Sequence, residues 1–127
     1  MEAVRLHGCT IDTLTLSTEQ KKLAEARIAA AGMTSSITVH LLDYRSLPAH
    51  WEHSFDRVIS IEMLEAVGKE YLEGYFGVVD WALKVGSGIG VFQGITIPEG
   101  RFEKYCKEVD FIRKYVSIIY ATSQAII

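Results

Sequence analysis

The sequence predicts an α/β fold built on a mainly parallel sheet. Segments rich in β-branched and apolar residues alternate along the chain with segments of helical periodicity. The expected strands are almost continuously apolar, which is typical of parallel strands that are buried on both faces. Helices that alternate with such strands connect them by right-handed crossovers and cover the sheet. Strands are therefore expected at residues 10–16, 36–42, 56–61 and 89–97.

Caps and apolar stripes define the expected helices. Ser17, with Gln20 three residues further on, has the pattern of a capping box, and Gly32 ends the helix that begins there. Apolar residues at helical spacing predict a second helix over residues 69–84. A further helix is expected over residues 101–115, so that helices follow the first, third and fourth strands.

Composition restricts the class of protein. The 127 residues suffice for one domain or part of a larger one, and a content of 49% hydrophobic and 23% charged residues is that of a globular protein. A formal net charge of −3 argues against a nucleic-acid surface. Cys9 and Cys106 lie far apart, which favours free thiols in a reducing compartment. No apolar run approaches the roughly 20 residues of a membrane span, so we expect a cytoplasmic protein whose contact with a membrane would be peripheral.

Two carboxylates follow the third expected strand. Residues 60–68 have the sequence SIEMLEAVG, which places Glu62 and Glu65 in the loop at the carboxyl end of a buried strand. Ligands bind at this edge of a parallel sheet, and a strand end holds a carboxylate in a fixed place for acid–base work. The alternative is that both glutamates are solvated at the start of the next helix, where acidic residues suit the helix dipole.

Polar residues also mark the ends of the second and fourth strands. The carboxylate of Asp43 could accept a hydrogen bond from an exocyclic amine, and the Tyr44 ring could cover a planar base. The alternative for Asp43-Tyr44-Arg45 is an Asx turn with an exposed tyrosine. Gln93 lies in an otherwise apolar strand and either bonds locally or faces a pocket, because burial without a partner would cost about 1–3 kcal/mol.

Two further patterns carry no cofactor or metal in our interpretation. Gly86-x-Gly88-x-Gly90 follows a helix and opens a strand, the reverse of the context that a nucleotide-binding loop needs, so we expect a plain turn. Three histidines near Asp43 match no standard zinc spacing, so we expect surface or locally bonded side chains and no metal site. These histidines are His40, His50 and His53.

Several of these segments resemble cyclopropane-fatty-acyl-phospholipid synthases. The matching segments are LTLSTEQ at 14–20, DYR at 43–45, FDRVISIEMLEAVG at 55–68 and DFIRKY at 110–115. Their order and spacing also match, and residues 60–68 are the most specific part. The resemblance implies the Rossmann-like class I methyltransferase fold and S-adenosylmethionine as cofactor. It also implies transfer of a methylene group to a cis double bond in an unsaturated phospholipid acyl chain.

The resemblance also implies which residues form the site. Positions that match the ribose and methionine side of the cofactor are Thr15, Leu16 and Gln20. Positions that match the adenine loop and its opposite wall are Asp43, Tyr44, Arg45, Ser60 and Ile61. Glu65 matches a glutamate that holds a bicarbonate ion, the presumed proton acceptor, and Ile95 matches a backbone ligand. Gln93 stands where some members carry a histidine that contacts bicarbonate, and an amide can still donate to an anion.

The resemblance predicts a partial domain over residues 1–115 and a divergent tail over residues 116–127. The start, MEAVRLHG, is typical of the end of a helix. The family's first strand, with its glycine-rich loop, would precede it and lie between strands 10–16 and 56–61. The C-terminal strands of the family are also missing, so we expect the chain alone to be inactive and to bind the cofactor weakly or not at all. Two alternatives stay open: a methyltransferase of a small soluble acceptor, and a non-catalytic remnant that binds a partner through open sheet edges.

Overall fold

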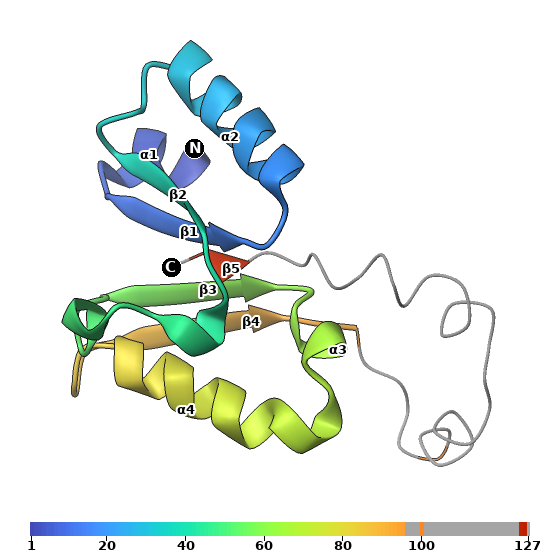
Figure 1. The fold of residues 1–127 in the computed structure, drawn as a ribbon. Coiled ribbons are helices and arrows are strands. Elements are labelled where there is room, and N and C mark those ends of the chain that lie inside the picture. The colour runs from blue at the N-terminus through green and yellow to red at the C-terminus, as the bar shows by residue number, and fades with distance from the viewer. Residues whose placement is uncertain (96–99, 101–124, 127) are drawn as a thin grey trace.

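A computed structural model describes residues 1–95, Gly100 and residues 125–126 (Figure 1). Helices and strands alternate along the chain as expected. The strands are β1 (Ile11–Thr15), β2 (Ile37–Leu41), β3 (Arg57–Ile61), β4 (Ile89–Gln93) and β5 (Ala125–Ile126). The helices are α1 (Glu2–His7), α2 (Thr18–Ala30), α3 (Leu64–Val67) and α4 (Leu72–Ala82). Short 3₁₀ turns lie at Tyr44–Ser46, Ala49–Trp51 and Lys69–Tyr71.

The sheet has the order β2-β1-β5-β3-β4. β1 is parallel to β2, with Thr15 opposite Leu41, and β3 is parallel to β4, with Ile61 opposite Gln93. The prediction of a mainly parallel α/β sheet is therefore confirmed. The centre of the sheet, between β1 and β3, is occupied by β5, which is antiparallel to both neighbours.

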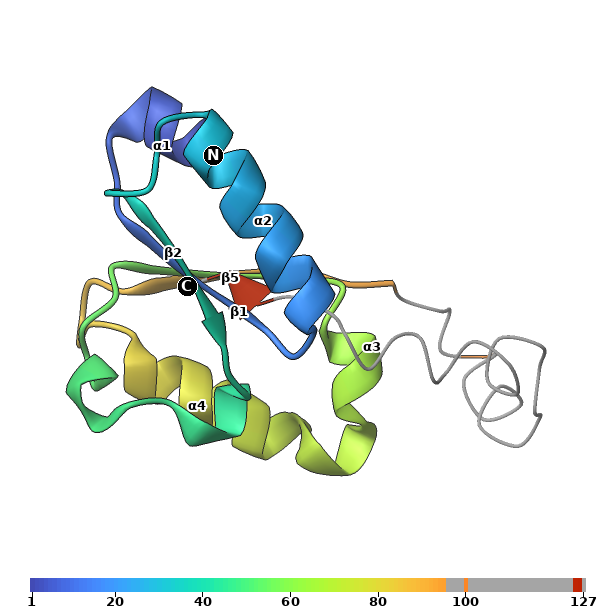
Figure 2. The same ribbon diagram turned by 45° about the horizontal axis from the view of Figure 1, so that its top comes forward.

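The helices form two groups around this sheet. In both views α1 and α2 lie beside β1 and β2, whereas α4 lies against β3 and β4 (Figure 1, Figure 2). The expected cap of α2 is present, because the Ser17 hydroxyl accepts from the Gln20 N–H at 3.2 Å. The start of the chain is the short helix α1, and Gly8 ends it with a φ of 62°. The described helices include none long and apolar enough to cross a membrane.

Two expected boundaries were wrong. The helix expected over residues 69–84 begins as a 3₁₀ turn and ends at Ala82, because Leu83 is extended and forms a bridge with Phe55. The strand expected over residues 89–97 ends at Gln93. Its partner β3 ends at the opposite position, Ile61, so the fourth strand has no neighbour on that side to pair with beyond this point.

Other expectations concern the turn and the segments after β4. Gly86 has a φ of 76° in the turn between α4 and β4, which confirms a plain turn in the glycine-rich segment. Cys9 is a free thiol, as expected. The helix expected over residues 101–115, most of the tail over residues 116–127, and Cys106 lie outside the described residues.

Two buried clusters form the core. One lies between α2 and β2 and consists of Ile28, Ile37 and Val39. The other lies between α4, β3 and the loop after β2, and consists of Leu14, Trp51, Val58, Met63, Tyr75 and Val79. The second cluster also contacts the segments that follow β2 and β3, so it packs against the loops at the carboxyl edge of the sheet.

Candidate functional site

The carboxyl ends of the parallel strands bring the predicted residues to one edge of the sheet. Thr15 ends β1, Ile61 ends β3 and Gln93 ends β4. Asp43 follows β2 after a single intervening residue, Leu42. Parallel strands share the direction of their carboxyl ends, so these positions lie along the same edge, where ligands bind in open α/β sheets.

The loop after β2 is an Asx turn. The Asp43 Oδ1 accepts from the backbone N–H of Arg45 at 2.9 Å, and the Arg45 guanidinium donates to both carboxylate oxygens, with Nη2 2.5 Å from Oδ2. The hydrogen bond from the Arg45 side chain holds the pKa of Asp43 below its usual range. The Asx turn, one of the two alternatives for this segment, is therefore found, but the tyrosine exposure that went with that alternative is not. The Tyr44 ring is half-buried and meets Tyr75 edge-on, with 5.4 Å between centroids.

The turn after β1 is held by the Thr15 hydroxyl. This buried group donates to the Gln20 Oε1 at 2.8 Å and accepts from the Ser17 N–H at 3.1 Å. Leu16, between them in the turn, is 55% exposed. Thr15 and Gln20 therefore shape the turn, and Leu16 is the side chain that it leaves open to a ligand.

The end of β3 alternates between buried and exposed side chains. Ser60 is 1% exposed, and its hydroxyl accepts from the Tyr75 hydroxyl at 2.6 Å. Ile61 is 37% exposed. Ser60 therefore supports the strand end from the core side, whereas Ile61 presents an apolar surface beside the edge. Glu62 then turns the chain with a φ of 52°, and its N–H donates to the Gln93 carbonyl at 2.8 Å.

Glu65 and Ile95 are in direct contact. Glu65 lies exposed on α3, and its Oε1 accepts from the Ile95 N–H. A Cβ on Gly94 would lie 3.3 Å from the same oxygen and 3.5 Å from the Leu64 Cδ1, so a larger residue there would crowd this contact. Gln93 is exposed and directly precedes Gly94. The structure thus brings Glu65 and Ile95 into contact and places Gln93 at the end of β4, two residues before Ile95.

Sequence reasoning missed two residues of this edge. Tyr75 lies in the apolar helix expected over residues 69–84 and is not among the predicted site residues, although it carries a hydroxyl and faces the only polar residue within β3 that is buried. Gly94, between Gln93 and Ile95, is not among them either. A polar side chain on an apolar stripe, opposite a serine in an apolar strand, is the signal that could have found Tyr75.

The histidines are bonded locally where contacts are described. The Nε2 of His40 lies 2.7 Å from the Oδ1 of Asp12, and the ring meets Trp51 edge-on. The Nδ1 of His53 lies 3.0 Å from the Leu83 carbonyl oxygen. In the described part of the chain, no three His, Cys, Asp or Glu side chains gather as a metal site.

The fold is that of an α/β protein whose candidate site residues lie at the carboxyl ends of parallel strands. The chain matches the model of the family described as mycolic acid cyclopropane synthetase over residues 1–118, and it belongs to this family. The family consists of S-adenosylmethionine-dependent methyltransferases that act on lipid acyl chains.

Three relatives support this membership. The tuberculostearic acid methyltransferase of Mycobacterium tuberculosis is 35% identical over 109 residues, which cover 86% of this chain and 24% of the relative. A probable fatty acid methyltransferase of Pseudomonas putida is 37% identical over 94 residues, which cover 74% of this chain and 23% of the relative. The cyclopropane-fatty-acyl-phospholipid synthase of Escherichia coli K12 is 39% identical over 71 residues, which cover 56% of this chain and 16% of the relative. The chain thus spans about a quarter or less of the length of these relatives.

Proposed function

We propose that this chain provides the adenine side and the proton-accepting side of a methyltransferase site that acts on an unsaturated lipid acyl chain. The observation that carries the proposal is the contact between the Glu65 carboxylate and the Ile95 N–H, directly beside Gln93. All three positions match the resemblance to cyclopropane synthases, and all three lie at the ligand-binding edge of the sheet.

The cofactor in this proposal is S-adenosylmethionine, which supplies an activated methyl group when it is bound. The Asp43 carboxylate is placed to accept from an exocyclic amine, sharing its oxygens with Arg45. Leu16 and Ile61 offer exposed apolar side chains at the ends of two strands that flank the centre of the sheet. The adenine base would bury apolar surface against Ile61, and the ribose and methionine side against Leu16, without disturbing the buried hydrogen bonds of Thr15 and Ser60.

The chemistry assigned to Glu65 is the acceptance of a proton. The Ile95 N–H occupies Oε1, which fixes the carboxylate and leaves Oε2 to take the proton that the transferred methyl group loses when the cyclopropane ring closes. A bicarbonate ion beside a carboxylate is repelled unless a shared proton or a hydrogen bond lies between them. The exposed amide of Gln93 can donate to such an anion.

The acyl acceptor is supported by the names of the relatives, two of which are a fatty acid methyltransferase and a cyclopropane-fatty-acyl-phospholipid synthase. In our proposal the product is a cyclopropane ring on a phospholipid acyl chain, and membrane contact is peripheral. A small soluble acceptor and a non-catalytic binding role are the competing outcomes of the test below.

The first arm of the test uses the full chain. Amide signals of the isotope-labelled protein are followed by NMR as S-adenosylmethionine is added. We expect weak binding that shifts Leu16, Asp43, Tyr44 and Ile61. Shifts confined to Gly86–Gly90 would argue for the non-catalytic role.

The second arm measures catalysis. Residues 11–95 replace the corresponding segment of the Escherichia coli cyclopropane-fatty-acyl-phospholipid synthase, and the transfer of labelled methyl groups to unsaturated phospholipid vesicles is measured. We expect labelled lipid that carries a cyclopropane ring. Label that appears only in soluble amines would replace the lipid acceptor with a small molecule, and an inactive graft that still binds cofactor would overturn the catalytic assignment.

A further inference from the structure

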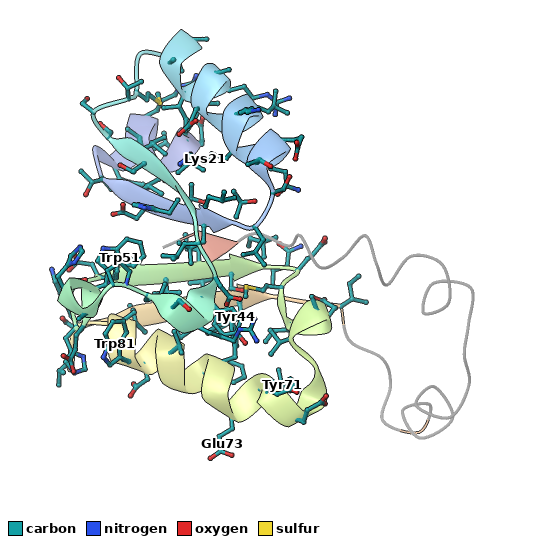
Figure 3. All side chains as sticks on the ribbon, in the orientation of Figure 1. Lys21, Tyr44, Trp51, Tyr71, Glu73 and Trp81 are labelled. Carbon is teal, nitrogen blue, oxygen red and sulfur yellow. The ribbon has the colours of Figure 1, made fainter. Side chains whose placement is uncertain are left out.

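Tyr75 contacts the three segments that carry the candidate site. Its side chain lies on α4 and is 2% exposed. Its hydroxyl donates to the Ser60 hydroxyl at the end of β3. Its ring lies edge-on to Tyr44, in the loop after β2, and edge-on to Phe92 of β4, with centroids 5.4 and 6.2 Å away. Figure 3 shows Tyr44 in the loop after β2, on the side of that loop where α4 lies.

We propose that Tyr75 is a positioning residue that sets the geometry of the Glu65–Ile95 pair and of the Asp43–Arg45 loop. The assignment of this geometry to catalysis rests on the function proposed above. Tyr75 reaches the reacting groups only through Ser60 and Tyr44, so its role is to hold the two sides of the site at a fixed spacing.

The hydrogen bond to Ser60 is directional, unlike the apolar contacts around it. Ser60 is the buried polar residue of a strand whose other buried residue is Val58. An unpaired hydroxyl there would cost about 1–3 kcal/mol, so the strand end is held where the bond can form. Burial raises the pKa of Tyr75, which keeps the phenol protonated and able to donate at neutral pH.

A displacement of Ser60 would also displace Glu65, because the segment that joins them is short and hydrogen-bonded to β4. Two residues further on, Glu62 adopts a φ of 52°, a conformation that non-glycine residues rarely take, and its N–H is bonded to the Gln93 carbonyl. The next turn is α3, which carries Glu65 to the Ile95 N–H. This segment has little conformational freedom, because the end of β3, the turn at Glu62 and β4 are hydrogen-bonded to one another.

The second contact of Tyr75 acts on the other side of the site. The Tyr44 ring lies against Tyr75, and the Arg45 guanidinium lies 6.0 Å from the Tyr44 ring centroid. Tyr44 is flanked in sequence by the ion pair of Asp43 and Arg45. The packing of one aromatic ring therefore fixes the loop that carries this ion pair.

The test uses the full chain and compares Tyr75→Phe with Tyr71→Phe. Tyr71 precedes α4 and is 61% exposed, so the second variant removes a hydroxyl of the same kind without touching Ser60. We expect Tyr75→Phe to shift the amide signals of Ile95 and Arg45 and to speed hydrogen exchange at Ile95 by about 2–10-fold, the equivalent of one lost hydrogen bond. Tyr71 interacts electrostatically with Arg45, so the control applies to Ile95, where Tyr71→Phe should leave both the amide signal and the exchange rate unchanged.

Ser60→Ala removes the same hydrogen bond from the other partner. It should reproduce the shift at Ile95, and the double variant should add little to either single variant. Additive shifts, or a Tyr75→Phe variant whose changes stop at Ser60 and Phe92, would overturn the proposal. If Tyr75→Phe fails to fold, Ser60→Ala carries the same readout. An inactive graft with coupled shifts would overturn only the proposed function, whereas an active graft without them would overturn only this inference.

Discussion

The first half of the molecule, residues 1–42, and the second half, residues 43–95, support the candidate site in different ways. The core of the first half is a small aliphatic cluster, and its site residues are held by hydrogen bonds within the turn after β1. The second half is built around Trp51 and Tyr75, and a buried hydrogen bond ties its strand end to a helix. The comparison shows that local turn contacts fix the site residues of the first half, whereas the buried core fixes those of the second half.

The largest effect is expected for the carboxylate of the second half. In an active graft, Glu65→Gln should reduce turnover by about 10²–10⁴-fold, because an amide cannot accept the proton that a general base must take. The affinity for the cofactor should change little, since Glu65 is not among the residues assigned to the cofactor. Steady-state rates on unsaturated phospholipid vesicles would measure both quantities.

Glu62→Gln is the matched control for this change. It alters the same kind of side chain three residues earlier, and we expect a smaller loss. If Glu65→Gln were as active as the unchanged graft, Glu65 would have no part in the mechanism and a soluble acceptor would be favoured.

The next effect compares the two cores. Trp51→Ala should lower the free energy of unfolding by about 3–5 kcal/mol, because it empties the centre of the larger cluster. Ile28→Ala should fall near the lower end of the 2–5 kcal/mol range, about 2–3 kcal/mol. Ile28 already borders a hollow of about 380 Å³ between α2 and β2, so fewer contacts are lost. Urea unfolding followed by circular dichroism would measure both variants.

This experiment also shows whether the halves unfold together. Trp51 contacts His40 of β2 as well as Phe55, so it links the two halves. We expect a single transition in both variants. Two separate transitions for Ile28→Ala would mean that the first half unfolds on its own. The site residues in the turn after β1 would then lie on a less stable part of the molecule than those of the second half.

The sequence was sufficient to predict features that depend on neighbouring residues. The strands are predicted from β-branched runs and the cap of α2 from Ser17, and the Asx turn at Asp43 is one of two alternatives that the sequence offers. Each of these depends on contacts within a few residues. The placement of Glu65 at the carboxyl edge followed from the strand before it. These features can be predicted because the periodicity and the caps are themselves written in the local sequence.

Features that depend on distant partners could not be predicted in this way. The end of β4 is decided by the end of β3, which no property of residues 94–97 reveals. The bond from Tyr75 to Ser60 joins residues 15 positions apart, and the tyrosine fits an apolar stripe equally well without it. The place of β5 in the centre of the sheet depends on the open edges of β1 and β3.

A smaller effect is expected for the cap in the first half. Ser17→Ala should lower the free energy of unfolding by about 1 kcal/mol, since it removes the side chain that accepts from the Gln20 N–H. Thr18→Ala is the control, because Thr18 is exposed and its hydroxyl contacts only the side chain of Glu19 among the described contacts. Urea unfolding would compare the two.

The cap also tests how the first half is held. If local turn contacts fix it, Ser17→Ala should shift the amide signals of Leu16 and Gln20 as well as lower the stability. An unchanged turn with an equal loss for Ser17→Ala and Thr18→Ala would show that the core, and not the cap, positions this side.

The smallest effect concerns the ion pair where the two halves meet. Arg45 lowers the pKa of Asp43, so the folded state favours the charged carboxylate. A lowered folded-state pKa adds stability above the pKa of the unfolded chain, about 3.9, and this contribution is lost as the pH falls through the folded value. Arg45→Gln should therefore move the Asp43 titration, followed by carboxyl NMR, upward toward its ordinary value. Arg57→Gln, which removes a cation whose guanidinium is bonded to the Asp56 and Ser87 carbonyls, should leave the titration in place.

Because Arg45 is exposed, we expect the loop itself to stay where Tyr75 holds it, with the Tyr44 signals unchanged. A displaced Tyr44 in Arg45→Gln would show that the ion pair, and not the aromatic contact, fixes this loop, and the second half would then depend on local contacts as the first half does.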